Sequence, residues 1–449
     1  MRNGKFDIVN GKTKPLFLRY CIPNVLGILA LSSAQLVDAF FIGNYAGAKA
    51  LAAINIVLPV FSLLMGVGIM LCTGGSVICA KFIGEKNYYN ASTIFSKVII
   101  SSAILSALVT LCGVIMPRQI VAFLGANEEL ISLSAEYLQY VSAFFAFFLG
   151  AYTLSVFARV EQRPLLAFGA ILFGVFVNII LDWLFIFKFH WGVKGAAVAT
   201  GLSQSITFLI IFTHFFSKHS GLRLYFRGMG HWGDLLKACY NGISELANEF
   251  SIGITTLIFN LIMIRQVGTV GVAAYTVINY ALLFGTLLAY GIGDSIVPLI
   301  STNYGAKKSS RIAGFLRLSL VSGASFSVLI FLGLMFAPET VVNFFLNEQD
   351  WETKTLALEF IDLLKWAFLF SSVSIILSSY FTAIEKPLES TVVALSRSLI
   401  FPVLFLMLMP RLFSLEGVFI SIPLAELTTV LIALTLFRKN EPRDLVMTA

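Results

Sequence analysis

Residues 52–80, AAINIVLPVFSLLMGVGIMLCTGGSVICA, form a continuous stretch that contains no Asp, Glu, Lys or Arg. A helix that crosses the hydrocarbon core of a bilayer needs about 20 predominantly apolar residues, so this stretch is long enough to span a membrane. The whole chain has the same character, because 58% of its 449 residues are apolar and only 12% are charged. A soluble globular protein carries about 25% charged residues. The composition predicts a multi-pass membrane protein and excludes a secreted disulfide scaffold, a disordered chain and a nucleic-acid-binding protein.

Twelve stretches of the chain meet the same criterion of length and hydropathy. They cover residues 15–43, 52–80, 93–116, 131–158, 165–187, 193–216, 236–263, 271–302, 312–336, 356–383, 388–409 and 416–437. Cytoplasmic loops of membrane proteins are enriched in Lys and Arg. With the N-terminus inside, 22 of the 31 basic residues fall on the inner side and eight on the outer side, while Arg397 lies within a helix. We therefore expect a protein of the plasma membrane (the inner membrane of a bacterium) with both termini in the cytoplasm.

The sequence also contains an internal repeat. At an offset of 221 residues, the aligned pairs include Gly47 with Gly268, Ala52 with Ala273, Gly84 with Gly305, Lys86 with Lys307 and Pro117 with Pro338. The repeat predicts an N-lobe of residues 1–221 and a C-lobe of residues 222–449, joined through the polar, basic stretch 217–235. Each lobe has six helices, and six is even, so both lobes enter from the cytoplasm. Such a parallel repeat is typical of transporters that bind their cargo between the two lobes.

Ionisable side chains at membrane depth are costly, and each is a functional hypothesis by default. At about 1.5 Å of rise per residue, four oxygen-bearing side chains of the N-lobe fall at a similar depth: Asp38, Asn178, Asp182 and Thr200. Two neighbouring buried carboxyl groups cannot both ionise at low cost. The cluster could therefore bind and release a proton, or its oxygens could hold Na⁺. In the alternative, structural interpretation, each acid only hydrogen-bonds a neighbouring helix or faces an outer vestibule.

The C-lobe carries a second set of charged side chains at membrane depth, which are secondary candidates: Glu245, Glu249, Asp294, Arg397 and Glu426. An ion pair of Arg397 with Asp294 or Glu245 is the structural interpretation for those three residues. Glu249 and Glu426 lie nearer the middle of the membrane with no evident cation. We therefore expect these two to be the better C-lobe candidates for a protonation or substrate site.

The first predicted helix contains a proline, Pro23. It removes a backbone hydrogen bond and favours a kink, which is either a simple bend or a hinge that moves when Asp38 changes protonation. The sequence has no HExxH, GxSxG or Walker A pattern, and its five cysteines have no metal-site spacing. We expect a transporter rather than an enzyme, with no cofactor and no firm metal site.

Short motifs spread over nearly the whole chain resemble those of the MATE (multidrug and toxic compound extrusion) family. They are Asp38 to Gly43 with Leu51-Ala52-Ala53, Pro59, Gly84, Gln162-Arg163-Pro164, Gly192 with Gly195-Ala196-Ala197, Asn241-Gly242-xx-Glu245, and Asn303-Tyr304-Gly305. The resemblance implies an all-α fold of twelve transmembrane helices in two pseudo-symmetric six-helix lobes that form a V. It also implies a monomer that exports amphipathic, often cationic, organic compounds by alternating access, against inward flow of H⁺ or Na⁺.

Within this family, Asp38, Asn178, Asp182 and Thr200 resemble the cation-coupling cluster of the DinF branch, whose proline-bent first helix matches Pro23. The NorM branch uses acids on helices 7 and 10, and this chain has no acid between Leu363 and Tyr380. We expect a DinF-like antiporter that is coupled to H⁺, with Na⁺ as the alternative coupling ion. The expected partners are small amphipathic molecules and membrane lipid, not nucleic acid.

The alternative is a lipid or glycolipid flippase of the same superfamily, which typically has a strongly basic cavity. This chain has one intramembrane Arg. A channel is a further alternative, although no pore-loop pattern stands out.

Overall fold

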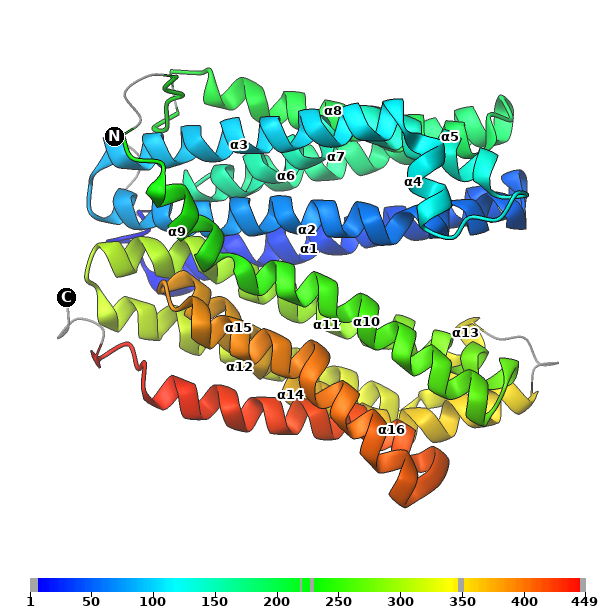
Figure 1. Ribbon diagram of the computed structural model, residues 1–449. Coiled ribbons are helices and arrows are strands. Elements are labelled where there is room, and N and C mark those ends of the chain that lie inside the picture. Colours follow the sequence, from blue (N-terminus) through cyan, green and yellow to red (C-terminus); the bar gives the residue numbers. More distant parts are fainter. Residues whose placement is uncertain (1–6, 219, 227–229, 346–350, 445–449) are drawn as a thin grey trace. The chain divides into compact units, whose positions relative to one another are not determined.

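The computed structural model describes residues 7–218, 220–226, 230–345 and 351–444, and all regular secondary structure in these ranges is helical. The helices of the first half are α1 (Thr13–Phe41), η2 (Ile42–Ala46), α2 (Ala48–Gly84), α3 (Tyr88–Ile115), α4 (Pro117–Phe123), α5 (Ile131–Ala143), α6 (Phe145–Val160), α7 (Pro164–Asp182), η3 (Trp183–Lys188), α8 (Gly192–Phe215) and α9 (Gly233–Asn241) (Figure 1). Those of the second half are α10 (Ile243–Gln266), α11 (Thr269–Gly305), α12 (Ser309–Phe336), α13 (Pro338–Phe345), α14 (Trp351–Ala383), α15 (Pro387–Leu395), η4 (Ser396–Ile400) and α16 (Phe401–Arg438).

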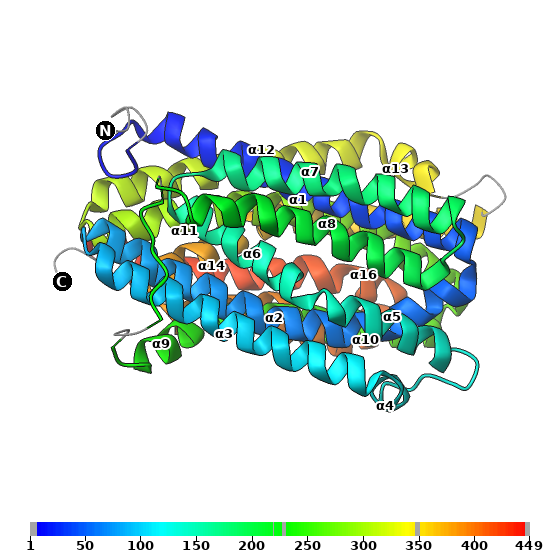
Figure 2. The same cartoon turned by 90° about the horizontal axis from the view of Figure 1, so that it is seen from above.

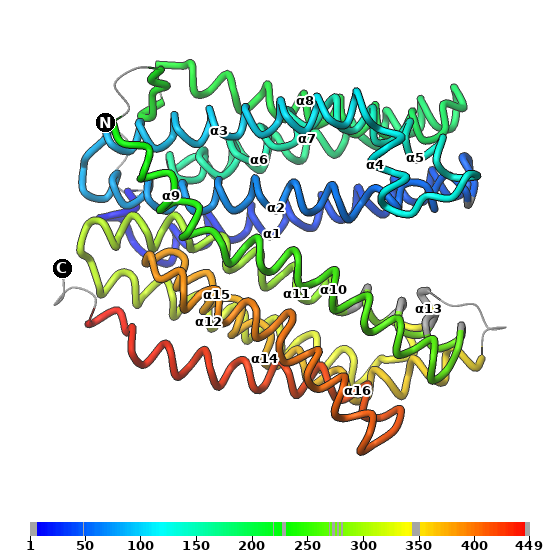
Figure 3. The backbone as a smooth tube through the Cα atoms, viewed as in Figure 1, coloured from blue at the N-terminus to red at the C-terminus, as the bar shows by residue number. Residues whose placement is uncertain are grey.

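The helices account for the predicted spans. Within the described residues, ten helices are long and apolar enough to cross a membrane, or eleven if α5 and α6, which meet at a bend of 46°, form one span. The last of them covers 52 residues, Pro387–Arg438, or about 78 Å at 1.5 Å per residue, whereas the hydrocarbon core is about 30 Å thick. Phe413 and Ser414 have non-helical dihedral angles, and the backbone reverses direction within α16 (Figure 3). The last helix therefore contains two spans, which agrees with the predicted stretches 388–409 and 416–437.

The internal repeat is confirmed in the backbone conformation. Gly47 and Gly268 precede α2 and α11 with φ angles of 89° and 79°, which favour glycine at both positions. Lys86 and Lys307 follow α2 and α11 with φ angles of 61° and 54°. In each case the next residue donates its N–H to a carbonyl five residues earlier, at 2.8 Å and 2.9 Å, which is the closing bond of a Schellman turn. Aligned positions in the two halves thus start and end their helices in the same way.

Contacts divide the chain into two compact units. The N-unit is Ile22–Gly242, and the C-unit is Met1–Cys21 together with Ile243–Ala449. The chain passes between the units inside α1, just before Pro23, and again between α9 and α10. This grouping differs from the repeat-based lobes 1–221 and 222–449, because each unit includes a short segment that leads into the first long helix of the other half.

In the C-unit, the N-terminal segment (residues 7–11) is bound to the turn between α11 and α12. Arg311 donates hydrogen bonds to the carbonyls of Ile8 (2.7 Å) and Gly11 (2.6 Å), and Asn303 Nδ2 donates to Ile8 at 3.2 Å. Lys308 Nζ donates to the Asn10 side chain at 2.8 Å. Backbone carbonyls of this segment are therefore satisfied by side chains almost 300 residues further along the chain.

In the N-unit, the described residues of the connecting segment (217–218, 220–226 and 230–232) are bound along α3. The hydroxyl of Ser96 accepts a hydrogen bond from the backbone N–H of Tyr225 at 2.8 Å. Lys97 is only 1% exposed, and its ammonium group donates to the carbonyl of His231 (2.7 Å) and pairs with Asp234 at 3.3 Å. A buried lysine needs such partners, so these contacts hold the connecting segment in place.

Candidate functional site

Two of the predicted site acids lie directly before short π-helices. Asp38 belongs to the last turn of α1, which continues as η2, and Asp182 is the last residue of α7, which continues as η3. The ends of both π-helices are closed by backbone hydrogen bonds of 3.0 Å between residues five apart, from Gly47 to Ile42 and from Phe189 to Leu184. Single π-turns are rare and frequently occur at functional sites, because they shift the helix face that follows them.

The four side chains that the sequence places at one depth are brought together in the N-unit. The carboxyl group of Asp38 interacts with the side chains of Asp182, Asn178 and Thr200. Asp182 is fully buried and Asn178 is 4% exposed, while Asp38 and Thr200 are partly buried. Depth counting along three separate helices therefore predicted a real cluster of side chains.

Several polar atoms in this cluster are buried without a hydrogen bond of normal geometry. Within the described residues, these include Asp38 Oδ1, both carboxyl oxygens of Asp182 and the side-chain nitrogen of Asn178. The Thr200 hydroxyl donates to the carbonyl of Ala196 at 3.0 Å, which leaves its oxygen able to accept. An unsatisfied buried polar group costs about 1–3 kcal/mol. The arrangement thus offers oxygen atoms to a proton or a small cation that enters the site.

The described residues contain no group of three or more His, Cys, Asp or Glu side chains placed to hold a metal ion. A Na⁺ ion at this cluster would therefore depend on the amide oxygen of Asn178 and the hydroxyl of Thr200 in addition to the two acids. Neutral oxygens of this kind are suitable ligands for a hard cation.

Tyr137 of α5 is a fifth member of the cluster that the sequence analysis missed. It interacts electrostatically with both Asp38 and Asp182. Its ring also packs against the apolar cluster formed by Ile42, Ala50, Ile54, Ile186, Val193 and Ala196. The available signal was its position near the outer start of the stretch 131–158, at the depth of the acids. A tyrosine in an apolar stretch has the pattern of a core residue, so depth along the helix does not distinguish it from its apolar neighbours.

Pro23 lies inside α1, which continues through it without a break from Thr13 to Phe41. Proline has no backbone N–H, so the carbonyl of Arg19 loses its helical donor at this point. The passage of the chain from the C-unit to the N-unit falls between Cys21 and Ile22, next to this weakened turn. The hinge role of Pro23 stays a prediction.

In the C-unit, Arg397 forms an ion pair with Glu426, whereas the sequence suggested Asp294 or Glu245 as its partner. Arg397 lies in the π-helix η4, and its Nη1 is 3.6 Å from Glu426 Oε1, with both side chains 9% exposed. Ser374 donates to the other oxygen of Glu426 at 3.2 Å. The expectation that Glu426 has no cation beside it is therefore wrong. Counting depth along a helix gives no information about the direction in which each side chain points, and here that direction decides the pairing.

The remaining C-unit candidates are linked to Arg397 through Glu245. Arg397 donates to the hydroxyl of Tyr290 and, at 3.4 Å, to the side-chain oxygen of Asn248, and its guanidinium carbon lies 5.2 Å from the centre of the Tyr290 ring. Glu245 interacts electrostatically with Arg397, Asp294 and Glu249. All five predicted residues therefore belong to one cluster. Its neutral members, Asn248, Tyr290 and Ser374, were missed because only charges were counted.

Comparison with known proteins agrees with this geometry. The MatE family model matches residues 23–184 and 248–407. The multidrug export protein MepA of Staphylococcus haemolyticus is 25% identical over 419 residues, which are 93% of this chain and 91% of that protein. MepA of Staphylococcus aureus strain MSSA476 is 26% identical over 419 residues, 93% of this chain and 92% of that protein.

Solved structures give the same result for the fold. A multidrug resistance MATE family transporter in an outward-facing conformation is similar with a TM-score of 0.92 and 21% identity, over 99% of each chain. A MOP superfamily transporter from Pyrococcus furiosus is similar with a TM-score of 0.90 and 22% identity, also over 99% of each chain. The family model covers the greater part of the chain and matches both repeats. The protein is therefore a multi-pass membrane transporter, not an enzyme, and it belongs to the MatE family.

Proposed function

We propose that this protein is an antiporter that exports amphipathic, often cationic, organic compounds in exchange for H⁺, with Na⁺ as the alternative coupling ion. The observation that carries the proposal is the convergence of Asp38, Asn178, Asp182 and Thr200 on one buried cluster. The names of the staphylococcal relatives, which are multidrug export proteins, support the direction of transport and the class of substrate.

The cluster suits cation coupling for an electrostatic reason. Two carboxyl groups in a buried site repel each other when both are charged, and binding one proton or one Na⁺ removes that repulsion. A cation that moves inward across the membrane releases about 2.3 kcal/mol per 100 mV of membrane potential. In the proposed cycle, loading of Asp38 and Asp182 bends α1 at Pro23 and expels the substrate outward. Release of the cation to the cytoplasm then resets the site.

We further propose that the protein acts as a monomer in the plasma membrane, the inner membrane of a bacterium, with both termini in the cytoplasm. The orientation is supported by the distribution of Lys and Arg, of which 22 fall on the inner side and eight on the outer side. The variants Lys12→Cys and Lys439→Cys test the orientation. Labelling of the introduced cysteine by a membrane-impermeant thiol reagent is measured in intact cells and in lysed cells. Labelling in intact cells would contradict it.

Transport in proteoliposomes with separately imposed pH and Na⁺ gradients tests the coupling. We expect uptake of a lipophilic cationic dye to follow the pH gradient, and we expect its loss in Asp38→Asn and Asp182→Asn. Asp362→Asn is the matched control, because the Asp362 side chain is 72% exposed and lies in the other unit. Transport that remains fully gradient-dependent in Asp38→Asn would refute the proposal. Movement of labelled lipid without dye transport would instead favour a flippase.

A further inference from the structure

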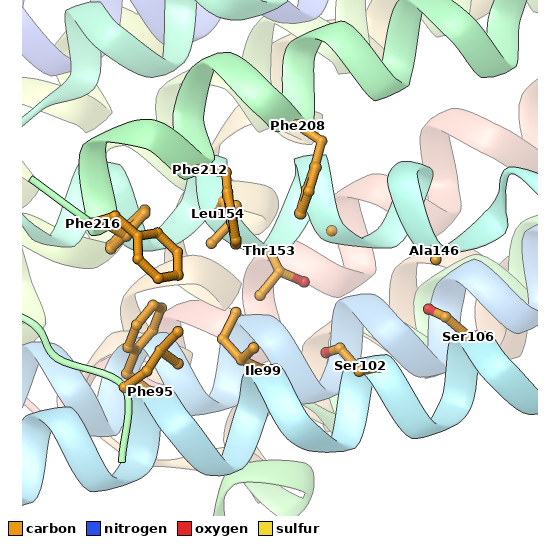
Figure 4. Close-up of a pocket in the computed structure, with 14 residues that line it drawn as sticks. Phe95, Ile99, Ser102, Ser106, Ala146, Thr153, Leu154, Phe208, Phe212 and Phe216 are labelled. Atoms are coloured by element: carbon orange, nitrogen blue, oxygen red, sulfur yellow. The ribbon is translucent and has the colours of Figure 1, made fainter. Parts of the chain in front are cut away.

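A groove lies on the N-unit between α3 and α8, with α6 as its floor. In the N-unit α6 packs against both α3 and α8 and lies between them (Figure 2). The groove has a volume of about 180 Å³. Aromatic rings from α8 and from Phe216, which directly follows it, face side chains of α3 across the groove (Figure 4). The labelled ones are Phe208, Phe212 and Phe216 on one side and Phe95, Ile99, Ser102 and Ser106 on the other. None of the residues of the cation cluster lines this groove.

The groove is long, narrow and apolar. On α3 its lining runs from Phe95 to Ser106, which is about 16 Å at 1.5 Å per residue. Thr153 on the floor donates its hydroxyl hydrogen to the carbonyl of Leu149 at 2.7 Å, so it is already satisfied. Gly150 lets the ring of Phe208 lie close to the floor, because a Cβ there would lie 2.8 Å from that ring. These dimensions suit a hydrocarbon chain better than a compact polar molecule.

The residues that line one end of the groove have basic and aromatic neighbours in the sequence. Phe216 and Leu224 line this end, and the exposed residues Lys218 and Arg223 follow and precede them in the sequence. Phe226 is 75% exposed and Tyr89 is 56% exposed. Exposed tyrosine side chains are typical of the membrane–water interface. Basic side chains at the cytoplasmic ends of transmembrane helices attract anionic lipid headgroups.

We propose that this groove binds an acyl chain of an anionic membrane phospholipid whose phosphate is held by Lys218 and Arg223. The apolar lining accounts for the hydrocarbon chain, and the two exposed cations account for the negative headgroup. Glu161, an acid whose side chain is only 5% exposed, accepts hydrogen bonds from the backbone N–H groups of Gly221 and Leu222 between the two cations in the sequence. This site is independent of the proposed transport activity, because it requires neither the acids nor a cation gradient.

The experiment uses the full-length protein in vesicles that contain phosphatidylcholine and a trace of photoactivatable phosphatidylglycerol with a diazirine in its acyl chain. After irradiation, mass spectrometry locates the labelled peptides. We expect labelling on the groove faces of α3, α6 and α8. The same probe with a phosphatidylcholine headgroup should label these faces several-fold less.

Two kinds of variant test the two halves of the proposal. Ala103→Trp fills the groove from α3 and should abolish its labelling, whereas Ile104→Trp, at a neighbouring position that does not line the groove and is 56% exposed, should leave it unchanged. Lys218→Gln and Arg223→Gln should each lower the preference for phosphatidylglycerol about fivefold. Lys237→Gln, at a side chain that is 78% exposed on α9, is the control.

Three outcomes would overturn the proposal: equal labelling by the two headgroups, labelling that persists in Ala103→Trp, or displacement of the lipid probe by a transported dye. The last result would identify the groove as part of the substrate path. The labelling is measured without a gradient, whereas the antiport experiment measures dye transport in Asp38→Asn. Failure of the lipid proposal can therefore be distinguished from failure of the proposed function.

Discussion

His214 Nε2 lies 2.8 Å from Glu161 Oε2, and the two side chains are 9% and 5% exposed. The other carboxyl oxygen of Glu161 accepts hydrogen bonds from the backbone N–H groups of Gly221 and Leu222, both at 2.6 Å, and from the hydroxyl of Ser220 at 2.9 Å. One side chain at the end of α6 thus binds the last turn of α8 and the start of the connecting segment together.

We expect Glu161→Ala to lower the stability of the N-unit by about 2–3 kcal/mol, because it leaves several buried donors without an acceptor. Glu161→Gln keeps one oxygen for the backbone donors and should cost less. Thermal unfolding of the purified protein and hydrogen exchange at Gly221 and Leu222 provide the measurements. If these two amides remain as protected in Glu161→Ala as in the wild type, the interpretation of Glu161 as the anchor is wrong.

The pair of Arg397 and Glu426 leads to a second prediction. Removing one partner leaves a charged group buried, which typically costs 3–5 kcal/mol. We expect Arg397→Met and Glu426→Gln each to destabilise the protein strongly, and the double variant to be more stable than the sum of the single effects predicts. A double-mutant cycle on thermal stability should give a coupling of about 0.5–3 kcal/mol. If the destabilisation in the double variant equals the sum of the two single effects, the two side chains contribute independently to stability and the prediction is wrong.

The crossing of α2 and α9 leads to a third prediction. A Cβ atom at Gly74 would lie 1.8 Å from the carbonyl oxygen of Ala238, and one at Gly242 would lie 1.9 Å from that of Met70. Since both neighbours are backbone atoms, the helices must separate, and we expect Gly74→Ala to cost about 1–3 kcal/mol.

Gly169→Ala is the matched control for this substitution. Gly169 lies within α7 and has no heavy atom within 4 Å of an added Cβ. Alanine there should stabilise the helix by about 0.5–1 kcal/mol. The melting temperatures of the two variants should therefore move in opposite directions, and a fall of equal size in both would contradict the close approach of α2 and α9.

Asp7 gives a prediction about pH. Burial raises the pKa of its carboxyl group, but hydrogen bonds from the side chain of Asn10 and the backbone of Val9, together with the positive charge of Arg311, lower it below the ordinary value. A carboxyl group whose pKa is lowered by folding stabilises the folded form above its unfolded pKa of about 3.9, and this stabilisation is lost as the pH falls through the folded value. An NMR titration of the labelled carboxyl carbon should therefore give a midpoint below 3.9. A midpoint at or above that value would contradict the contacts seen at the N-terminal segment.

The sequence predicted the spans well because hydropathy is averaged over many residues. It did not reveal the bend at Phe144, where α5 ends and α6 begins, or the short helices α4 and α13, which lie between the long apolar stretches. It also did not reveal that the stretch 236–263 is divided between α9 and α10. Such features depend on local backbone geometry and on packing against neighbouring helices, and a count of apolar residues contains neither.

For the candidate site, depth along the helices was sufficient to group Asp38, Asn178, Asp182 and Thr200. It was insufficient for Arg397, whose ion pair with Glu426 depends on helix rotation and on the π-turn η4. Tyr137 was missed for a chemical reason, because its ring is apolar while its hydroxyl is not. The sequence thus specified the depth of the polar groups, and tertiary packing determined their partners.

The attachment of the N-terminal segment to Arg311 has a consequence for biosynthesis. Asn303, Lys308 and Arg311 bind residues 7–11 but are synthesised about 300 residues after them. Large chains generally fold part by part as they are synthesised. Residues 7–11 therefore remain without these partners during synthesis until the first turn of α12 has been made, so this contact forms only after the whole N-unit has been synthesised.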